Sequence, residues 1–196
     1  MSRPLAGYRV LEVGARLASA YATKSLLELG ATVIALRPDP DPIASAPPIA
    51  GDPPVSTLAM YLDTAKDLRP FDVDALWQLA AESDIVIVGL SPREAEALDL
   101  VPGPFEKRAP NAVLVNVTSF GLDGPYRDFL GDDTLLLAIG GVMDLTGDAD
   151  REPLATYGHF GEYHLGMAAA IAALQGVYGA ATGDTNVSAD VSGFEV

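Results

Sequence analysis

Short apolar runs that alternate with helix-like segments constrain the fold of this chain most strongly. The first unit joins a strand over 8–13 (YRVLEV), a helix over 17–29 that Gly30 stops, and a strand over 31–36 (ATVIAL). A helix over 74–81 and two buried strands, 84–90 and 111–117, follow. Successive strands joined by helices form a parallel sheet with right-handed crossovers. The sequence therefore predicts an α/β fold, a Rossmann-like open parallel sheet with helices on both faces.

One segment interrupts this alternation. Seven prolines fall within the seventeen residues 38–54, and proline removes backbone donors from helices and ladders. We expect residues 38–56 to form an extended, Pro-rich surface loop rather than a linker, because strands and helices of the same style resume after it. Residues 1–196 are thus predicted to form a single domain.

A long uncharged segment, 163–183, predicts a long apolar helix near the C-terminus. Its length would suffice to cross a bilayer. It is, however, rich in Ala and Gly, it contains His164 and Gln175, and no Lys or Arg follows it to set an orientation. We therefore predict a helix inside the core of a soluble protein. The residues at helical spacing that would face this core are Met167, Ile171, Leu174 and Tyr178.

Composition excludes several classes of partner. The formal net charge is −15, whereas binding to a phosphate backbone depends on Lys and Arg, so no nucleic-acid partner is expected. The chain contains no cysteine, which rules out disulfides and thiolate metal sites and favours a cytoplasmic location. The first ten residues lack the apolar run of a signal peptide.

Ligands of open parallel sheets bind beyond the carboxyl ends of the strands, which points to the loops after Val13, Leu36, Leu90 and Val117. The first of these loops lacks the three glycines of a dinucleotide-binding fingerprint, and the sequence has no Walker A run. A different candidate is Glu162, a single carboxylate at the start of the long apolar helix. A helix-start acid favoured by the macrodipole is the alternative explanation for it.

Five motifs in order resemble the family III CoA-transferases, the group that contains formyl-CoA transferase, carnitine CoA-transferases and α-methylacyl-CoA racemase. They are PLAGYRVLEVGARLASAYATKSLLELGATVIALRP, FGLDGPYRD, GDDTLLLAIGGVMDLTGD, GEYHLGMAAAIAAL and VSADVS. The resemblance implies transfer of coenzyme A between an acyl-CoA thioester and a carboxylic acid acceptor, with CoA as substrate, no other cofactor and no metal. It further implies that one carboxylate acts as nucleophile and carries CoA as a thioester.

The resemblance places this nucleophile at Glu162, nine positions after Pro153 and four before Gly166. The family residue is usually Asp, and the additional methylene of Glu moves the carboxylate outward by about one bond length, so either the pocket is reshaped or transfer is lost. For CoA binding, the resemblance implies backbone contacts at Leu17 and Ala18.

Side chains are implied at two further CoA-binding positions, Arg37 and Lys66. A surface charge flanking a strand is the alternative explanation for Arg37.

Members of the family continue beyond this strand and assemble as interlocked dimers, so the chain resembles their N-terminal part. The resemblance implies a homodimer or a partner chain that supplies the remaining parts. A degenerate, non-catalytic domain that acts as a structural partner stays open as an alternative, as does a generic α/β small-molecule binder. A racemase is favoured less, because Asp132 stands where its histidine would be. The sequence does not indicate the acyl or acceptor substrates.

Overall fold

A computed structural model describes residues 3–196 and has a six-stranded, wholly parallel sheet at its centre. The strand order is β5-β2-β1-β6-β7-β8. The strands are β1 (Arg9–Gly14), β2 (Thr32–Arg37), β5 (Asp67–Pro70), β6 (Ile85–Gly89), β7 (Val113–Thr118) and β8 (Ser188–Ser192). This confirms the predicted open parallel sheet.

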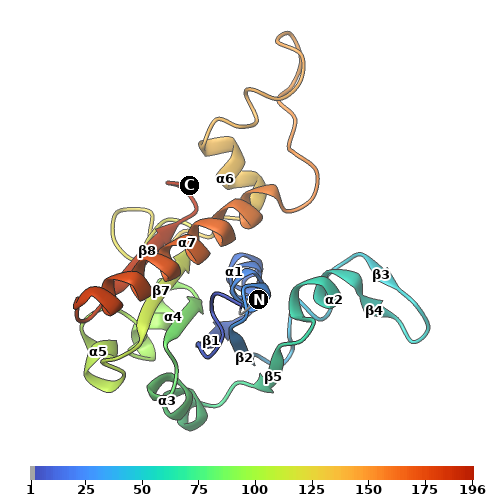
Figure 1. The fold of residues 1–196 in the computed structure, drawn as a ribbon. Coiled ribbons are helices and arrows are strands. Elements are labelled where there is room, and N and C mark those ends of the chain that lie inside the picture. Colours follow the sequence, from blue (N-terminus) through green and yellow to red (C-terminus); the bar gives the residue numbers. More distant parts are fainter. Residues whose placement is uncertain (1–2) are drawn as a thin grey trace.

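Helices cover both faces of the sheet (Figure 1). Helices α1 (Leu17–Glu28) and α7 (Phe160–Thr182) pack on one face, and α3 (Val73–Ala81), α4 (Pro92–Ala97) and α5 (Pro104–Arg108) pack on the other. Successive strand residues point to opposite faces. In β6, for example, Ile85 and Ile87 join the core under α1 and α7, whereas Val86 and Val88 join the core under α3 to α5. Both faces of the sheet are therefore buried.

The strand order reverses between β1 and β6, and two glycines bring the ends of these strands together. Gly14 has φ +98°, and a Cβ there would lie 2.7 Å from the carbonyl oxygen of Gly89. A Cβ on Gly89 would in turn collide with Ser19 Oγ in the first turn of α1. Only glycine fits both positions, and the start of α1 is thereby held against the carboxyl end of the sheet, where ligands of such folds bind.

The proline-rich segment contains more regular structure than predicted. The strands β3 (Ile49–Ala50) and β4 (Val55–Ser56) pair antiparallel within it, and helix α2 (Thr57–Asp63) follows at once. The seven prolines all lie outside the four paired residues, which is how a ribbon forms among them. This ribbon and the segment between α6 (Asp133–Ile139) and α7 both project from the body of the molecule (Figure 1).

The orientation predicted for α7 is wrong. Of the four residues expected in the core, Met167, Ile171 and Tyr178 are 44, 57 and 73 % exposed, and Leu174 is only partly buried. The buried face instead consists mainly of small residues: Leu165, Gly166, Ala169, Ala170, Ala173 and Gly176, together with Glu162 at the helix start.

Close approach of two helices explains this orientation. A Cβ on Gly166 would lie 2.6 Å from the carbonyl oxygen of Ala18 in α1. Small residues allow backbones to come this near, whereas large apolar side chains at the same positions would separate the helices. By length and composition α7 is the one helix of residues 3–196 that passes the test for a membrane span. Here it packs along α1 and the sheet as part of the α/β core.

Candidate active site

The carboxylate of Glu162 is held between two groups of the β1–α1 connection. Its Oε1 accepts a hydrogen bond from Arg16 Nη2 at 2.6 Å, and its Oε2 accepts one from the backbone N–H of Ala18 at 2.9 Å. Glu162 is the third residue of α7 and is 8 % exposed. Each carboxylate oxygen therefore accepts a hydrogen bond, and the donor to Oε1 is a charged guanidinium. Little of the residue is accessible to water.

The N-termini of three helices converge around this carboxylate. Helix α1 receives no side-chain cap from Arg16, its own N-cap residue, and the Glu162 carboxylate binds its first turn at Ala18 instead. The backbone N–H of Glu162 donates to Asp133 Oδ1 at 2.7 Å, and Asp132 caps α6 by accepting from the backbone N–H of Leu135 at 2.8 Å. Unpaired N–H groups and the helix dipole both favour an anion at each of these ends.

Arg16 connects the carboxylate to the loop after β7. Its Nη1 donates to Ser119 Oγ at 3.1 Å, and that hydroxyl donates to the carbonyl oxygen of Gly131 at 2.9 Å. The side chain of Arg16 is 18 % exposed. Within residues 3–196, Arg16 Nε is buried and finds no hydrogen-bond partner, and the same holds for Thr156 Oγ1. The site thus contains two polar groups with unused hydrogen-bonding capacity.

Two adjoining clefts meet at Arg16. One, of about 540 Å³, is lined by the following residues: Arg16, Leu17, Gly131, Asp132, Asp133, Thr134, Thr156, Gly158, His159 and Glu162. The other, of about 490 Å³, lies at the carboxyl ends of the strands and is lined by Ala15, Pro38, Ser91 and Ser119 among others. These four residues come from the four loops at which the sequence predicts ligand binding. Arg16, Gly131 and Asp132 line both clefts.

Of the two histidines near Glu162, one belongs to the cleft. His159 lines it beside Glu162, with its ring 6.5 Å from that of Tyr163. His164 is exposed, and its Nδ1 lies 2.8 Å from the carbonyl oxygen of Phe160 one turn earlier. His164 lines a different hollow, near Phe194.

Arg37 and Lys66, two of the residues expected to bind CoA, lie in a buried ion-pair network instead. Lys66 has no exposed side-chain surface, and its Nζ contacts Glu12 Oε2 at 2.9 Å, Asp63 Oδ1 at 3.1 Å and the carbonyl oxygen of Ala20 at 2.9 Å. Three acceptors use all three ammonium hydrogens. This placement argues against a direct contact between Lys66 and CoA.

Arg37 belongs to the same network. Its Nη1 lies 2.8 Å from Glu12 Oε1 and donates to the carbonyl oxygen of Gly14 at 2.8 Å, while its Nη2 donates to Asp63 Oδ1 at 2.7 Å. Burial acts to lower the pKa of Arg37, but the charges of Glu12, Asp63 and Asp41 outweigh it, so its pKa is raised above the ordinary value. The side chain is 5 % exposed and anchors the end of β2 to β1. The geometry favours a structural role for Arg37 over a direct contact with CoA.

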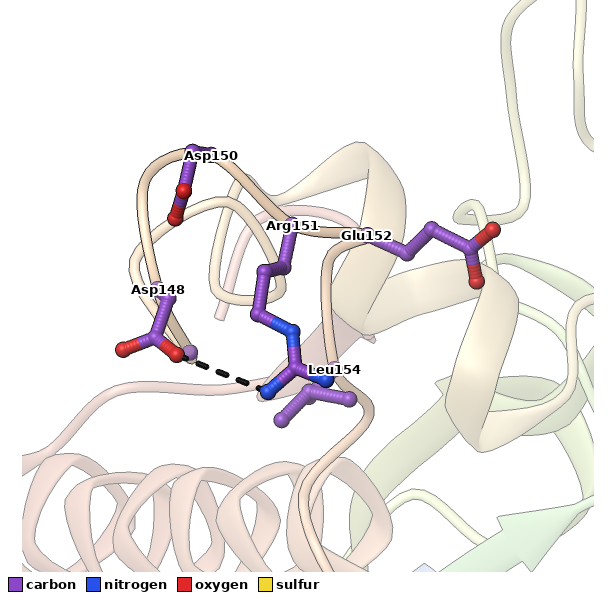
Figure 2. Close-up of a pocket in the computed structure, with 6 residues that line it drawn as sticks. Asp148, Asp150, Arg151, Glu152 and Leu154 are labelled. Atoms are coloured by element: carbon purple, nitrogen blue, oxygen red, sulfur yellow. Dashed lines mark ion pairs between the residues drawn. The ribbon is translucent and has the colours of Figure 1, made fainter.

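A further hollow, of about 710 Å³, lies within the segment between α6 and α7 (Figure 2). Its lining includes Asp148, Arg151 and Glu152, all exposed, and Arg151 Nη1 is 3.7 Å from Asp148 Oδ2. In Figure 2 the Glu152 side chain points away from this ion pair. The hollow shares no lining residue with the Glu162 clefts. It contributes nothing to that site.

No three His, Asp or Glu side chains among residues 3–196 are grouped so that they could hold a metal ion. The site residues that sequence reasoning missed are Arg16, Ser119 and Asp133. A usable signal existed for Arg16: it is the single charge between the apolar strand over 8–13 and the helix over 17–29. Its pairing with Glu162 was not readable, because 146 positions separate the two residues.

The sequence also matches a known protein family over almost its whole length. A family described as CoA-transferase family III matches residues 5–196. The chain belongs to CoA-transferase family III. This confirms the resemblance drawn from the motifs, and the match covers every element that positions Glu162.

Curated relatives of the family III chain are CoA-transferases. The chain is 28 % identical over 163 residues to succinyl-CoA:glutarate CoA-transferase of Homo sapiens. This match covers 78 % of the chain and 36 % of the relative. The chain is 32 % identical over 168 residues to succinyl-CoA–D-citramalate CoA-transferase of Chloroflexus aurantiacus, covering 77 % and 39 %. Formyl-CoA:oxalate CoA-transferase of Streptomyces avermitilis is 27 % identical over 188 residues, covering 91 % and 45 %. The matched regions thus span 36 to 45 % of the length of these relatives.

Among solved structures, a CAIB/BAIF family protein from Brucella suis superposes with a TM-score of 0.90 at 26 % identity. The match covers 100 % of the family III chain and 54 % of that protein. A structure of Rv3272 from Mycobacterium tuberculosis has a TM-score of 0.84 at 22 % identity and supports the fold alone.

Proposed function

We propose that the chain takes part in transfer of CoA from an acyl-CoA thioester to a carboxylic acid, with Glu162 as the nucleophile. The observation that carries the proposal is the position of the Glu162 carboxylate, on a side chain that is 11 % exposed, in a cleft at the N-terminus of α1. Its immediate neighbours supply an arginine and a backbone N–H. These are the donors that a reaction with changing charge on oxygen requires.

In the proposed reaction the Glu162 carboxylate attacks the thioester carbonyl carbon. The carbon–sulfur bond breaks, so CoA leaves as a thiolate and the acyl group stays on Glu162 as a mixed anhydride. The thiolate then attacks the carbonyl carbon of Glu162, the donor acid leaves as its carboxylate, and CoA stays on Glu162 as a thioester. An acceptor carboxylate reverses these steps and removes CoA as the new acyl-CoA. The backbone N–H of Ala18 is placed to stabilise the oxyanion that forms on the Glu162 carbonyl.

CoA binding is proposed in the cleft at the carboxyl ends of the strands, next to Glu162. Leu17 lines the Glu162 cleft and stays a proposed CoA contact. The Ala18 N–H is engaged by Glu162 in this state, so we assign it to the reacting oxygen rather than to CoA. Arg127 lines the strand-end cleft as well, and it is the proposed cationic partner for a CoA phosphate there.

The donor and acceptor acids are proposed only as a class. Succinyl-CoA is the first donor to use, because several relatives are named for it. A homodimer or partner chain is proposed to cover the exposed apolar stripe of α7, formed by Met167, Ile171 and Tyr178. The cytoplasmic location stays a prediction from composition.

The test is a covalent adduct. The purified chain is incubated with succinyl-CoA, and the intact mass and the peptide containing Glu162 are measured by mass spectrometry. The expected result is a CoA thioester on Glu162 that hydroxylamine removes. Glu162→Gln should form none, whereas Glu152→Gln, which changes an exposed carboxylate in the α6–α7 segment, should form it normally. A chain that binds CoA yet forms no adduct under these conditions would instead support the non-catalytic alternative.

A further inference from the structure

We propose that Arg16 binds the carboxylate of the acid substrate when Glu162 carries CoA as a thioester. This inference deepens the proposed function and rests on it. In the resting protein Arg16 Nη2 is paired with Glu162 Oε1 at 2.6 Å. The same guanidinium lines both clefts, so it stands where an acid must enter or leave.

Charge balance requires such a partner. The ion pair is poorly solvated, with 18 % of the Arg16 side chain and 11 % of the Glu162 side chain exposed. When Glu162 becomes a CoA thioester, its carboxylate charge disappears, while arginine keeps its charge at any pH relevant to proteins. An unpaired charge in such a site is strongly unfavourable. The thioester state therefore needs another anion beside Arg16.

The reaction itself supplies that anion. When Glu162 passes from carboxylate to CoA thioester, one donor acid is released as its carboxylate, so the number of negative charges in the site is conserved. The same holds in reverse, when the acceptor carboxylate enters and Glu162 is regenerated. Arg16 thus exchanges one carboxylate for another at each half-reaction, and a planar guanidinium accommodates either with paired hydrogen bonds.

The surroundings leave room for this exchange. Arg16 Nη1 is anchored to Ser119 Oγ at 3.1 Å, which keeps the guanidinium in place when Glu162 is neutral. Within residues 3–196, Arg16 Nε and Thr156 Oγ1 are buried without hydrogen-bond partners, and both residues line the Glu162 cleft. A bound carboxylate offers acceptors that such groups lack. The orphaned hydroxyl of Thr156 is an observation independent of the ion pair, and it points to a polar ligand.

The test is an equilibrium binding cycle that needs no turnover. Glu162→Gln imitates the loss of charge in the thioester state, because the glutamine side chain is neutral and close to the native size. Binding of succinate is measured by calorimetry for the wild-type chain, Glu162→Gln, Arg16→Gln and the double variant, with succinamide as the uncharged control ligand. We expect Glu162→Gln to bind succinate about tenfold or more tightly than wild type, as a charge-assisted hydrogen bond provides. The double variant should lose this gain, and succinamide should show none.

Equal succinate affinity of Glu162→Gln and wild type, or a gain that persists in the double variant, would overturn the proposal. Thermal midpoints establish that each variant is folded. If Arg16→Gln does not fold, Arg16→Lys in the Glu162→Gln background replaces it, and this variant should retain part of the gain because the charge remains.

The outcome is separable from that of the adduct experiment. A wild-type chain that forms no CoA adduct, combined with the expected binding cycle, would refute the transfer reaction and keep Arg16 as a carboxylate-binding residue. An adduct, combined with equal succinate affinity of the wild-type chain and the Glu162→Gln variant, would keep the transfer reaction and refute the role of Arg16. Where the adduct forms, a kinetic readout is also available. Arg16→Gln should slow discharge of the Glu162 thioester by succinate while discharge by hydroxylamine, a neutral nucleophile, is little changed.

Discussion

The Oε2 of Glu162 accepts a hydrogen bond from the backbone N–H of Ala18 at 2.9 Å, across 144 positions of sequence. This bond joins the first turns of α7 and α1. A Cβ on Gly166, one turn further along α7, would lie 2.6 Å from the carbonyl oxygen of the same Ala18. The position of the candidate nucleophile therefore depends directly on how closely two helices pack.

We predict that Gly166→Ala destabilises the chain. The new methyl group would meet the Ala18 backbone and the Tyr21 side chain, and overpacking of this kind costs about 1–3 kcal/mol. Urea unfolding gives the loss in free energy. Gly179→Ala, in the same helix, is the control: its methyl group faces the flexible end of Asp184, so a neutral or slightly stabilising effect is expected. Equal effects of the two substitutions would contradict the packing argument.

Glu162→Asp should impair formation of the CoA adduct while the chain stays folded. The side chain shortens by one methylene, and the carboxylate then falls short of both Arg16 and Ala18. A misplacement near 1 Å costs roughly a hundredfold in rate. Quenched-flow mass spectrometry of the adduct measures this rate. Adduct formation as fast as in wild type would show that the pocket is not shaped for Glu.

Lys66→Met should be strongly destabilising, because it leaves Glu12 and Asp63 buried with one cation fewer. Breaking a buried ion pair from one side costs about 3–5 kcal/mol. Arg69→Met removes a half-exposed pair with Asp67 and should change the free energy of unfolding far less. Urea unfolding of both variants tests this. If Lys66→Met weakens CoA binding and leaves stability intact, the original CoA-binding prediction would be restored.

Ile171→Gln should leave the stability of the isolated chain within about 0.5 kcal/mol of wild type, because this side chain is 57 % exposed. Sedimentation at increasing concentration should show weaker self-association than wild type if the α7 stripe is an interface. Ala169→Gln is the matched contrast. Residue 169 has no exposed surface, so the larger polar side chain should lower the free energy of unfolding by about 1–3 kcal/mol. The reverse ranking would restore the orientation first predicted for α7.

Asp190→Asn should stabilise the chain near neutral pH. Burial raises the pKa of Asp190 first of all, the hydrogen bond from the Leu122 N–H opposes this, and the charges of Asp123 and Glu195 raise it further. The raised pKa means that the folded state favours the protonated form. The associated stability is present at low pH and is lost as pH rises through that pKa.

Asparagine removes this loss while its side-chain oxygen still accepts from Leu122. The gain in thermal midpoint over wild type should therefore be larger near pH 7 than near pH 4. Asp150→Asn, in the exposed α6–α7 segment, corrects for the general effect of removing one negative charge. A gain that is independent of pH would contradict the assignment.

Short apolar runs in the sequence correctly predicted three central strands and the end of the first helix. The runs YRVLEV, ATVIAL and DIVIVGL became β1, β2 and β6, and Gly30 ends α1 with φ +112°. The short elements α2, α4, α5, α6, β5 and the β3–β4 ribbon were missed, because a few residues carry too little periodicity to stand out. The proline count indicated a loop, yet it says nothing of the four residues between the prolines that pair.

Sequence by itself determined the α/β architecture, since apolar runs at strand and helix spacing need no distant partner to be recognised. It also placed a single carboxylate, Glu162, at the start of the long helix. Only the tertiary structure decided which face of α7 is buried. Small residues add packing energy only where another backbone comes into contact with them. It also decided that Arg16 is the partner of Glu162, whereas Arg37 and Lys66 turn inward to Glu12. The attraction between two charged side chains depends on the distance between them in space, and that distance is set when the sheet and its helices pack together.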